Sequence, residues 1–265
     1  MKQKLKRNPF VRYCYYSLMA FLALVKLPFL KHPEAMQRYK GIHKGERCFI
    51  VSTGPSLTVG DIEALRNEIT FSMNSIVKSF GITDWRPTYY VVSDRIPFEA
   101  CKSLINHEDF EMTFYRCGID NANSNVCHFV ADNTGYYNCL RKNKFKGKLF
   151  PSKRLERYFN NAPSVVFSIV QLAIYMGFSE IYLLGQDCNF ANASHASFAA
   201  SKYRVLPTDA DARKILDTFN NYEIALSNTG VSIYNVTRGG NLDLFVRKEL
   251  NDVLGTRTVL EVGRE

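Results

Sequence analysis

The beginning of the sequence lacks acidic residues. Residues 1–33 contain no aspartate or glutamate but seven lysines and arginines, which leaves a net charge of +2 for residues 34–265 out of +9 for the whole chain. A fold that binds nucleic acid is expected to carry its basic charge on the folded body. The charge distribution therefore argues against a nucleic-acid partner and points to a separate role for the N-terminus.

The chain also lacks three familiar signatures. Its seven cysteines form no C-x-x-C pair and no zinc-site spacing, which is typical of reduced thiols in a cytoplasm. The absence of a G-x-x-x-x-G-K-[ST] motif excludes the common P-loop nucleotide site. No internal repeat or low-complexity linker divides the 265 residues, which suit one large α/β domain or two small ones.

An apolar run long enough to span a membrane is absent as well. Residues 13–25 are uncharged, but a span takes about 20 apolar residues, and no small-x-small cleavage site follows. A short apolar helix with basic flanks is typical of a segment in the interface of an anionic membrane. Packing on the body or on a second subunit is the alternative. We expect residues 1–40 to form this helix and a linker, and the protein to be cytoplasmic and peripheral on the inner face of the cytoplasmic membrane.

Residues 41–265 alternate short apolar runs with helical segments, as one catalytic domain would. Residues 118–161, rich in Asn, Tyr and Lys, are expected to form a lid or an excursion from the sheet. Continuous apolar strands between helices indicate an α/β fold with a mostly parallel sheet covered on both faces. Strands are predicted at residues 48–51, 68–74, 88–94, 112–117, 180–187 and 231–237, and helices at 75–80, 97–106, 164–178 and 211–230.

Polar and small residues follow five of these strands. The first segment, residues 52–56 ("STGPS"), lies between a strand and a helix start, an order typical of phosphate binding but also of an ordinary turn. The carboxyl ends of parallel strands meet at one edge of a sheet, where ligands bind. Five such strand ends make a binding cleft the better interpretation. They are residues 52–56, 74–75, 93–94, 186–189 and 237–240.

The motifs around these strand ends resemble a known bacterial family. In order, "KGERCFIVSTGPSL", "EITFSMNSI", "WRPTYYVVSD", "SEIYLLGQDCNF" and "IYNVTRGGNLDLF" are similar to surface-polysaccharide proteins described as 6-hydroxymethylpterin pyrophosphokinase-like. That family is related to the motility-associated-factor glycosyltransferases. A more distant similarity is to bacterial sialyltransferases that use CMP-sialic acid. The resemblance covers about residues 40–245 and implies a Rossmann-like fold and a nucleotide-linked donor.

The resemblance also implies a binding role for residues at the strand ends. The loop at residues 54–56 would lie near the nucleotide phosphates, and Asn74 would hydrogen-bond the nucleotide. Asp187 and Asn189 would lie beside the donor, and Ser164 would approach it from the start of a helix. With the other strand-end residues and nearby cations, the candidate binding residues are Ser52, Thr53, Gly54, Pro55, Ser56, Asn74, Ser75, Asp94, Ser164, Gly185, Asn189, Arg204 and Arg238.

Two departures from the pattern bear on catalysis. Thr53 replaces an amide residue of the related motif, and "VLPTDADARK" lacks the histidine that serves the sialyltransferases as general base. His195 is the predicted base here, because it lies eight residues after Asp187 in a loop expected to overhang the cleft, although an exposed histidine without a role would look the same. Asp187 is the second catalytic candidate. Leaving-group help would come from Lys202, Tyr203, Arg204 or Arg238, each of which also fits a solvated surface position.

A metal requirement is left open by the sequence. Residues 209–211 ("DAD") match a D-x-D metal motif, but acids in a first helical turn are favoured by the helix dipole alone, so we assign no metal ligand. Asp94 and Asp187 would be equally suitable ligands in a metal-dependent enzyme. The sialyltransferase likeness implies no obligatory cofactor, whereas the pyrophosphokinase likeness implies ATP and Mg²⁺.

Three functions follow from these observations. The first is a glycosyltransferase that carries a nucleotide sugar, such as CMP-linked sialic acid or Kdo, to a surface polysaccharide or lipid-linked acceptor. The second is an ATP-dependent pyrophosphokinase of the 6-hydroxymethylpterin type. The third is a non-enzymatic nucleotide-binding component of a polysaccharide assembly complex. Homo-oligomer formation is compatible with all three.

Overall fold

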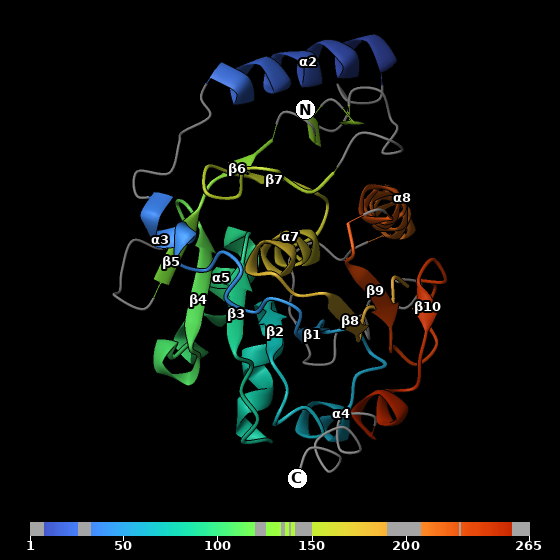
Figure 1. Cartoon of the computed structure of the whole chain (residues 1–265). Helices are drawn as coiled ribbons and strands as arrows, with labels where there is room; N and C mark the ends of the chain where they lie inside the picture. Colours follow the sequence, from blue (N-terminus) through green and yellow to red (C-terminus); the bar gives the residue numbers. More distant parts are fainter. Residues whose placement is uncertain are drawn as a thin grey trace.

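A single parallel sheet organises the chain (Figure 1). The computed structural model describes residues 8–25, 33–119, 126–133, 136–137, 139–140, 150–189, 208–227 and 229–255. Within these residues the sheet has eight strands in the order β10-β9-β8-β1-β2-β3-β4-β5. The strands are β1 Arg47–Val51, β2 Thr70–Met73, β3 Tyr89–Val92, β4 Met112–Arg116, β5 Val126–Phe129, β8 Glu180–Leu184, β9 Ser232–Asn235 and β10 Val246–Arg247.

Two hydrophobic layers cover the two faces of the sheet. Alternate residues of a strand point to opposite faces, so Ile50 packs in one layer while Phe49 and Val51 pack in the other. The layer around Ile50 contains α7 and α8, and the opposite layer contains α4, η1 and α5. The helices are α2 Pro9–Val25, α3 Pro33–Gln37, α4 Val59–Glu63, α5 Arg95–Cys101, α7 Val166–Met176 and α8 Asp209–Leu226, with 3₁₀ helices η1 Asn74–Gly81, η2 Lys102–Leu104 and η3 His107–Asp109.

The order of the strands creates a switch point between β1 and β8. From β1 the chain moves outward through β2, β3, β4 and β5, and it then returns to place β8 on the other side of β1. Every described pair in the sheet is parallel. In such sheets the loops diverge above the switch point and leave a crevice at the carboxyl ends of the strands. The Rossmann-like α/β fold predicted from the sequence is confirmed.

The segment at residues 118–161, predicted to be a lid or an excursion, divides into two parts. Its strand β5 extends the main sheet, whereas β6 Ala131–Asp132 and β7 Phe159–Asn160 pair in a separate parallel sheet. The fully buried Gln171 of α7 attaches this small sheet to the body. Its Oε1 accepts from the backbone N–H groups of Ser152 (2.9 Å) and Asn160 (3.0 Å), and its Nε2 donates to the carbonyls of Asn160 and Phe167, both at 3.0 Å.

The N-terminal helix α2 lies at the outer side of the small sheet (Figure 1). The ring of Tyr16 stacks on Tyr137 with 6.4 Å between centroids. The chain after it packs more deeply, because Met36 of α3 and Tyr39 are buried in the hydrophobic core. Among the described helices none is long and apolar enough to cross a membrane.

Candidate functional site

A cavity of about 120 Å³ lies at the switch point. The loops after β1 and β8, the end of β2, the start of α7 and Ile215 of α8 form its walls. It brings together nine of the residues predicted from the sequence. These are Ser52, Thr53, Gly54, Pro55, Asn74, Ser164, Gly185, Asp187 and Asn189.

Asp187 is the carboxylate of this cavity, and it is 8% exposed. Its Oδ2 accepts a hydrogen bond of 2.9 Å from the Ser56 hydroxyl, and its backbone carbonyl accepts one of 2.7 Å from the Asn241 N–H. Burial raises its pKa, and hydrogen bonds from Ser56 only partly oppose this. No lysine, arginine or histidine of the described residues forms an ion pair with it. A buried carboxylate without a cation is costly and indicates a functional site.

Two glycines make room for Asp187. A side chain at Gly54 would meet the Asp187 carboxylate, and a Cβ at Gly240 would be 2.7 Å from the Asp187 backbone oxygen. Gly240 also has a φ of +74°, which favours glycine. The loop after β1 thus packs against the side chain of Asp187, and the loop after β9 packs against its backbone.

Asn74 contributes a polar side chain whose oxygen has no hydrogen-bond partner among the described residues. Its φ is +50°, which is uncommon for a residue with a side chain, and its carbonyl oxygen accepts a hydrogen bond of 2.6 Å from the Tyr90 hydroxyl. Its Oδ1 is buried and has no hydrogen-bond partner among the described residues. Strained backbone and unpaired buried polar groups concentrate at functional sites. Asn74 therefore combines a place in the cavity wall with a buried acceptor oxygen that no described residue uses.

Cys188 is the other described non-glycine residue with a positive φ, at +52°. Gln186 Nε2 donates to its sulfur at 3.3 Å, and burial raises the pKa of the thiol to about 11. A thiol with such a pKa is protonated at neutral pH and is a poor nucleophile. Cys188 thus shapes the cavity wall, a role that nothing in the sequence indicated.

The expected anion-binding groups of the first loop are already engaged. The Gly54 N–H donates to the Gly185 carbonyl at 3.0 Å, and the Ser56 N–H bonds to Asp187. Thr58 and Asp61 form a capping box at the start of α4, which engages the backbone N–H groups of these two residues. The N–H groups of Gly54, Ser56, Thr58 and Asp61 thus already have partners within the protein.

Helix α7 offers the alternative. It has 11 residues and begins next to Ser164, which lines the cavity, and no side chain of the described residues caps its N-cap residue Val165. The N-terminus of a helix carries a partial positive charge and unpaired N–H groups, and it binds anions. The start of α7 is therefore the helix N-terminus that borders the cavity.

Arg238 is held away from the cavity. Its guanidinium forms a two-point ion pair with Asp61, with Nη1 at 2.7 Å from Oδ1, and it donates to the Ser56 carbonyl at 3.1 Å. The hydrogen bonds with Asp61 raise the pKa of Arg238. Burial would raise the pKa of Asp61, but bonds from Arg238 and Thr58 lower it overall. Arg238 therefore fixes the loop after β1 instead of lining the cavity.

Ser75 and Asp94 also lie outside the cavity wall. Ser75 is fully buried at the start of η1. Asp94 accepts a hydrogen bond of 3.1 Å from the Ser93 hydroxyl and lies near Tyr136. Burial, and to a smaller extent the charges of Asp211 and Asp94, raise the pKa of Tyr136 to about 12.

The D-x-D motif has a structural explanation. Asp211 forms a capping box with Thr208 at the start of α8 and an ion pair of 2.7 Å with Lys214. Burial opposes its ionisation, but the bonds from Lys214 and Thr208 lower its pKa overall. In the part of the chain that the structure describes, no group of three or more His, Cys, Asp or Glu side chains is placed to hold a metal ion.

Several predicted residues lie outside the described residues. Positions 190–207 contain the predicted base and the cations predicted to assist the leaving group. Their roles therefore remain sequence-based predictions. The residues are His195, Lys202, Tyr203 and Arg204.

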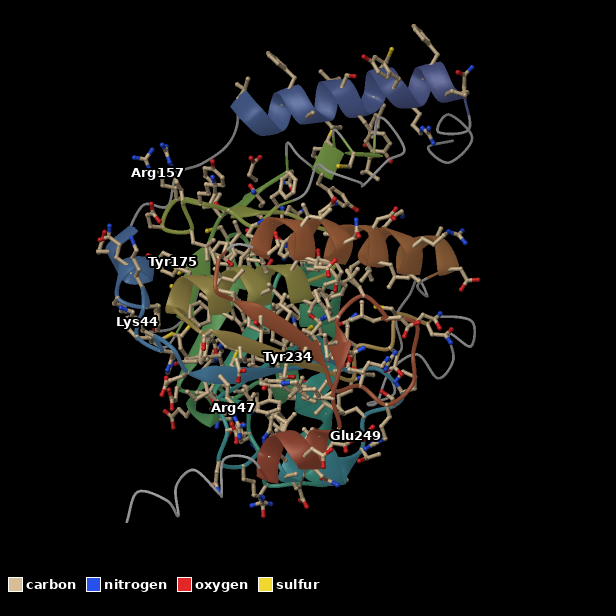
Figure 2. All side chains as sticks on the ribbon, turned by 45° about the vertical axis from the view of Figure 1, so that its right-hand side comes forward. Lys44, Arg47, Arg157, Tyr175, Tyr234 and Glu249 are labelled. Atoms are coloured by element: carbon tan, nitrogen blue, oxygen red, sulfur yellow. The ribbon has the colours of Figure 1, made fainter. Side chains whose placement is uncertain are left out.

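A larger hollow of about 880 Å³ lies at the opposite, amino edge of the sheet. Arg47 and Glu249, both labelled in Figure 2, line it. Both of its arginines are paired with acids, since Arg47 bonds Glu68 at 2.7 Å and Arg247 bonds Asp243 at 2.8 Å. Because ligands of parallel sheets bind at the carboxyl edge, we place the site at the smaller cavity.

Comparison with known proteins agrees with this fold. A family model described as 6-hydroxymethylpterin diphosphokinase MptE-like matches residues 23–193. A search of curated proteins finds no match. The solved structure of MAf glycosyltransferase from Magnetospirillum magneticum AMB-1 is similar, with a TM-score of 0.52 and 17% identity over 90% of this chain and 42% of that chain. The chain thus spans less than half of that protein's length, and the likeness at this identity is one of fold. The resemblance predicted from the motifs is confirmed.

Proposed function

The chain belongs to the family described as 6-hydroxymethylpterin diphosphokinase MptE-like, and on this premise we propose that it is a transferase that binds a phosphate-linked donor in the switch-point cavity. One observation carries the proposal. Asp187, a buried carboxylate without a cationic partner among the described residues, shares the cavity with the unpaired Oδ1 of Asn74. Each group lowers stability until a ligand supplies a donor or a cation.

The leading candidate reaction is glycosyl transfer from a nucleotide sugar to a glycan or lipid-linked hydroxyl. The bond between the sugar and the donor phosphate breaks, and a bond from the acceptor oxygen to the same sugar carbon forms. The positive end of α7 stabilises the departing phosphate. Asp187, whose pKa burial raises, or the sequence-predicted His195, accepts the proton of the acceptor hydroxyl. A glycosyltransferase of similar fold supports this candidate.

The second candidate is diphosphate transfer from ATP to a small hydroxymethyl substrate, which the description of the family favours. The substrate oxygen would attack the β-phosphorus of ATP, and AMP would leave. Mg²⁺ is usually held by one or two carboxylates together with substrate phosphates. The residues fit, because Asp187 and Asn74 offer two oxygen ligands with no cation beside them in the described residues. The ion would neutralise charge on the transferred phosphates.

A thermal-shift panel on the full chain distinguishes the candidates. CMP, CDP, UDP, GDP and ATP are tested, each with and without Mg²⁺, since a ligand at 100 times its Kd stabilises the native state by about 2.7 kcal/mol. Stabilisation by a pyrimidine nucleotide without metal supports the glycosyltransferase, and stabilisation by ATP only with Mg²⁺ supports diphosphate transfer. The absence of stabilisation by all five would overturn the proposal.

Product analysis completes the test. A glycosyltransferase releases a nucleotide and a lengthened acceptor, whereas diphosphate transfer releases AMP. Binding without turnover would support the non-enzymatic role in a polysaccharide assembly complex. In each case Asn74→Gly is expected to weaken ligand stabilisation, while Asn106→Ala, at an exposed 3₁₀ cap far along the chain, serves as the control.

A further inference from the structure

The outer face of α2 carries a row of exposed apolar side chains. Phe10, Leu18, Phe21 and Val25 are 74%, 56%, 62% and 65% exposed, and Cys14 on the same row is exposed as well. The members of this row are three or four residues apart, so they lie on one side of the helix. We call these five residues the outer stripe. Scattered surface apolar residues are ordinary, but a stripe along a whole helix marks an interaction site.

The opposite side of α2 is attached to the body. Ala20 is 5% exposed, and Tyr16 stacks on Tyr137. Figure 1 shows α2 at the outer end of the molecule, and Figure 2 shows side chains that point away from the body on its outer side. The outer stripe thus faces outward because of how the helix packs, and no described residue covers it.

The charge around α2 identifies the chemistry of the partner. All seven charged side chains of residues 1–33 are basic, with Lys2, Lys4, Lys6 and Arg7 before the helix and Lys26 and Lys31 after it. A protein partner would match an apolar stripe without requiring this excess, whereas a bilayer with anionic headgroups matches both features. The helix has 17 residues, a length of about 25 Å, and is not among the helices that could span a bilayer.

We propose that α2 lies flat on an anionic lipid surface, with the outer stripe inserted among the acyl chains and the flanking lysines and arginines on the headgroups. The family match begins at residue 23, so most of this helix precedes the segment that defines the family. The proposal does not depend on which transferase reaction the body catalyses.

Vesicle flotation of the full-length protein tests the proposal. Wild type is expected to float with vesicles that contain phosphatidylglycerol and not with neutral phosphatidylcholine vesicles, and the binding is expected to weaken as salt is raised. The double substitution Leu18→Asp and Phe21→Asp is expected to reduce binding at least tenfold. Ile224→Asp is the matched control, because Ile224 is 60% exposed on α8 and lies outside the stripe.

Cysteine labelling gives a second measurement. Cys14 and Cys117 are the two exposed cysteines, and the other five are buried. A polarity-sensitive dye on Cys14, in a Cys117→Ser background, is expected to shift to the blue on anionic vesicles, and a dye on Cys117, in a Cys14→Ser background, is not. Equal flotation of the stripe variant and wild type would overturn the proposal. A second result would also overturn it: the wild type does not bind vesicles but sediments as a dimer, and the stripe variant sediments as a monomer. A second copy of the chain would then cover the outer stripe.

Discussion

A Cβ atom at residue 54 would collide with the Asp187 carboxylate and with the Gly185 carbonyl oxygen. The loops after β1 and β8 therefore touch at the switch point with no space for a methyl group. Position 54 requires glycine because the two loops approach closely there. Its backbone conformation is not the reason, because Gly54 is not among the glycines with a positive φ. Position 54 is thus a sensitive place to test whether the cavity is the site.

Gly54→Ala is expected to displace Asp187 and to reduce the affinity for nucleotide at least tenfold, which thermal shift detects as a smaller rise in Tm. The overpacking itself is expected to lower the free energy of unfolding by about 1–3 kcal/mol. Urea unfolding and thermal shift with nucleotide measure the two effects. Gly81→Ala is the control, because a Cβ at Gly81 would meet no atom within 4 Å. Unchanged stability and binding in Gly54→Ala would contradict the packing at the cavity.

Asp187→Asn is expected to stabilise the protein at neutral pH. Burial raises the pKa of Asp187 in the folded state, so its favourable contribution is present at low pH and is lost as the pH rises through the folded pKa. Asparagine removes the ionised form, and the gain in the free energy of unfolding over wild type should therefore grow between pH 4 and pH 8. A gain that shrinks with rising pH would show that the ionised carboxylate is stabilised in the native state.

The same substitution separates the two candidate reactions. Without a metal, an ionised Asp187 repels donor phosphates, so Asp187→Asn is expected to bind a pyrimidine nucleotide as tightly as wild type or more tightly. If Asp187 helps to hold Mg²⁺, the variant is expected to lose at least tenfold in affinity for ATP with Mg²⁺ and little for ATP alone. Isothermal titration with and without Mg²⁺ measures the difference.

Asn74→Gly is expected to keep or increase stability while it weakens ligand binding. A non-glycine residue in the left-handed region costs about 1–2 kcal/mol, and glycine removes that cost together with the buried Oδ1. Asn74→Ala keeps the strain and is expected to be the less stable of the two. Chemical denaturation with and without nucleotide compares them. A glycine variant that binds nucleotide like wild type would exclude Oδ1 from ligand recognition.

Arg238→Gln is expected to destabilise the protein by about 1–3 kcal/mol at pH 7, because it leaves the buried Asp61 without its cation. The bonds from Arg238 and Thr58 outweigh burial and lower the pKa of Asp61. This contribution to stability is therefore present above the unfolded pKa of about 3.9 and is lost as the pH falls through the folded pKa.

Urea unfolding from pH 2 to pH 7 measures the effect. As the pH is lowered, the free energy of unfolding should fall less steeply for Arg238→Gln than for wild type. Arg95→Gln is the control, because the exposed Arg95 pairs with Glu99 at only 3.5 Å, and such surface pairs contribute little. Equal losses of unfolding free energy in the two variants would show that the ion pair of Arg238 with Asp61 contributes no more than an exposed surface pair.

The central strands were predictable because they are buried on both faces. The apolar runs at residues 48–51 and 112–117 correspond to β1 and β4. A strand covered on both faces is apolar throughout and does not alternate apolar with polar residues. The edge strands β5 and β10 were not predicted, because β10 has only two residues and β5 is a short run directly after the Asn-rich residues 121–125. The segment after β2 forms a 3₁₀ helix rather than a regular one, a difference that spacing alone does not resolve.

The candidate site was predictable to the extent that it depends on strand ends. Asn74 and Asp187 meet in the cavity because parallel strands end at a common edge. The bonds that decide which groups remain available come from residues distant in sequence. Arg238 pairs with Asp61, 177 residues away, and the Gly54 N–H bonds Gly185. Such pairings depend on three-dimensional packing, and no local motif indicates them.

Three of the four hydrogen bonds of Gln171 join Ser152 and Asn160 to α7, the helix that begins next to Ser164 of the cavity, and the fourth lies within α7. Separation of residues 152–160 from α7 therefore requires this one amide to give up three of its partners. In hydrogen exchange, the N–H groups of Ser152 and Asn160 would report this step directly. Together with Leu155 and Phe159, which are buried in the main core, Gln171 thus couples residues 150–160 to the helix that begins beside the site.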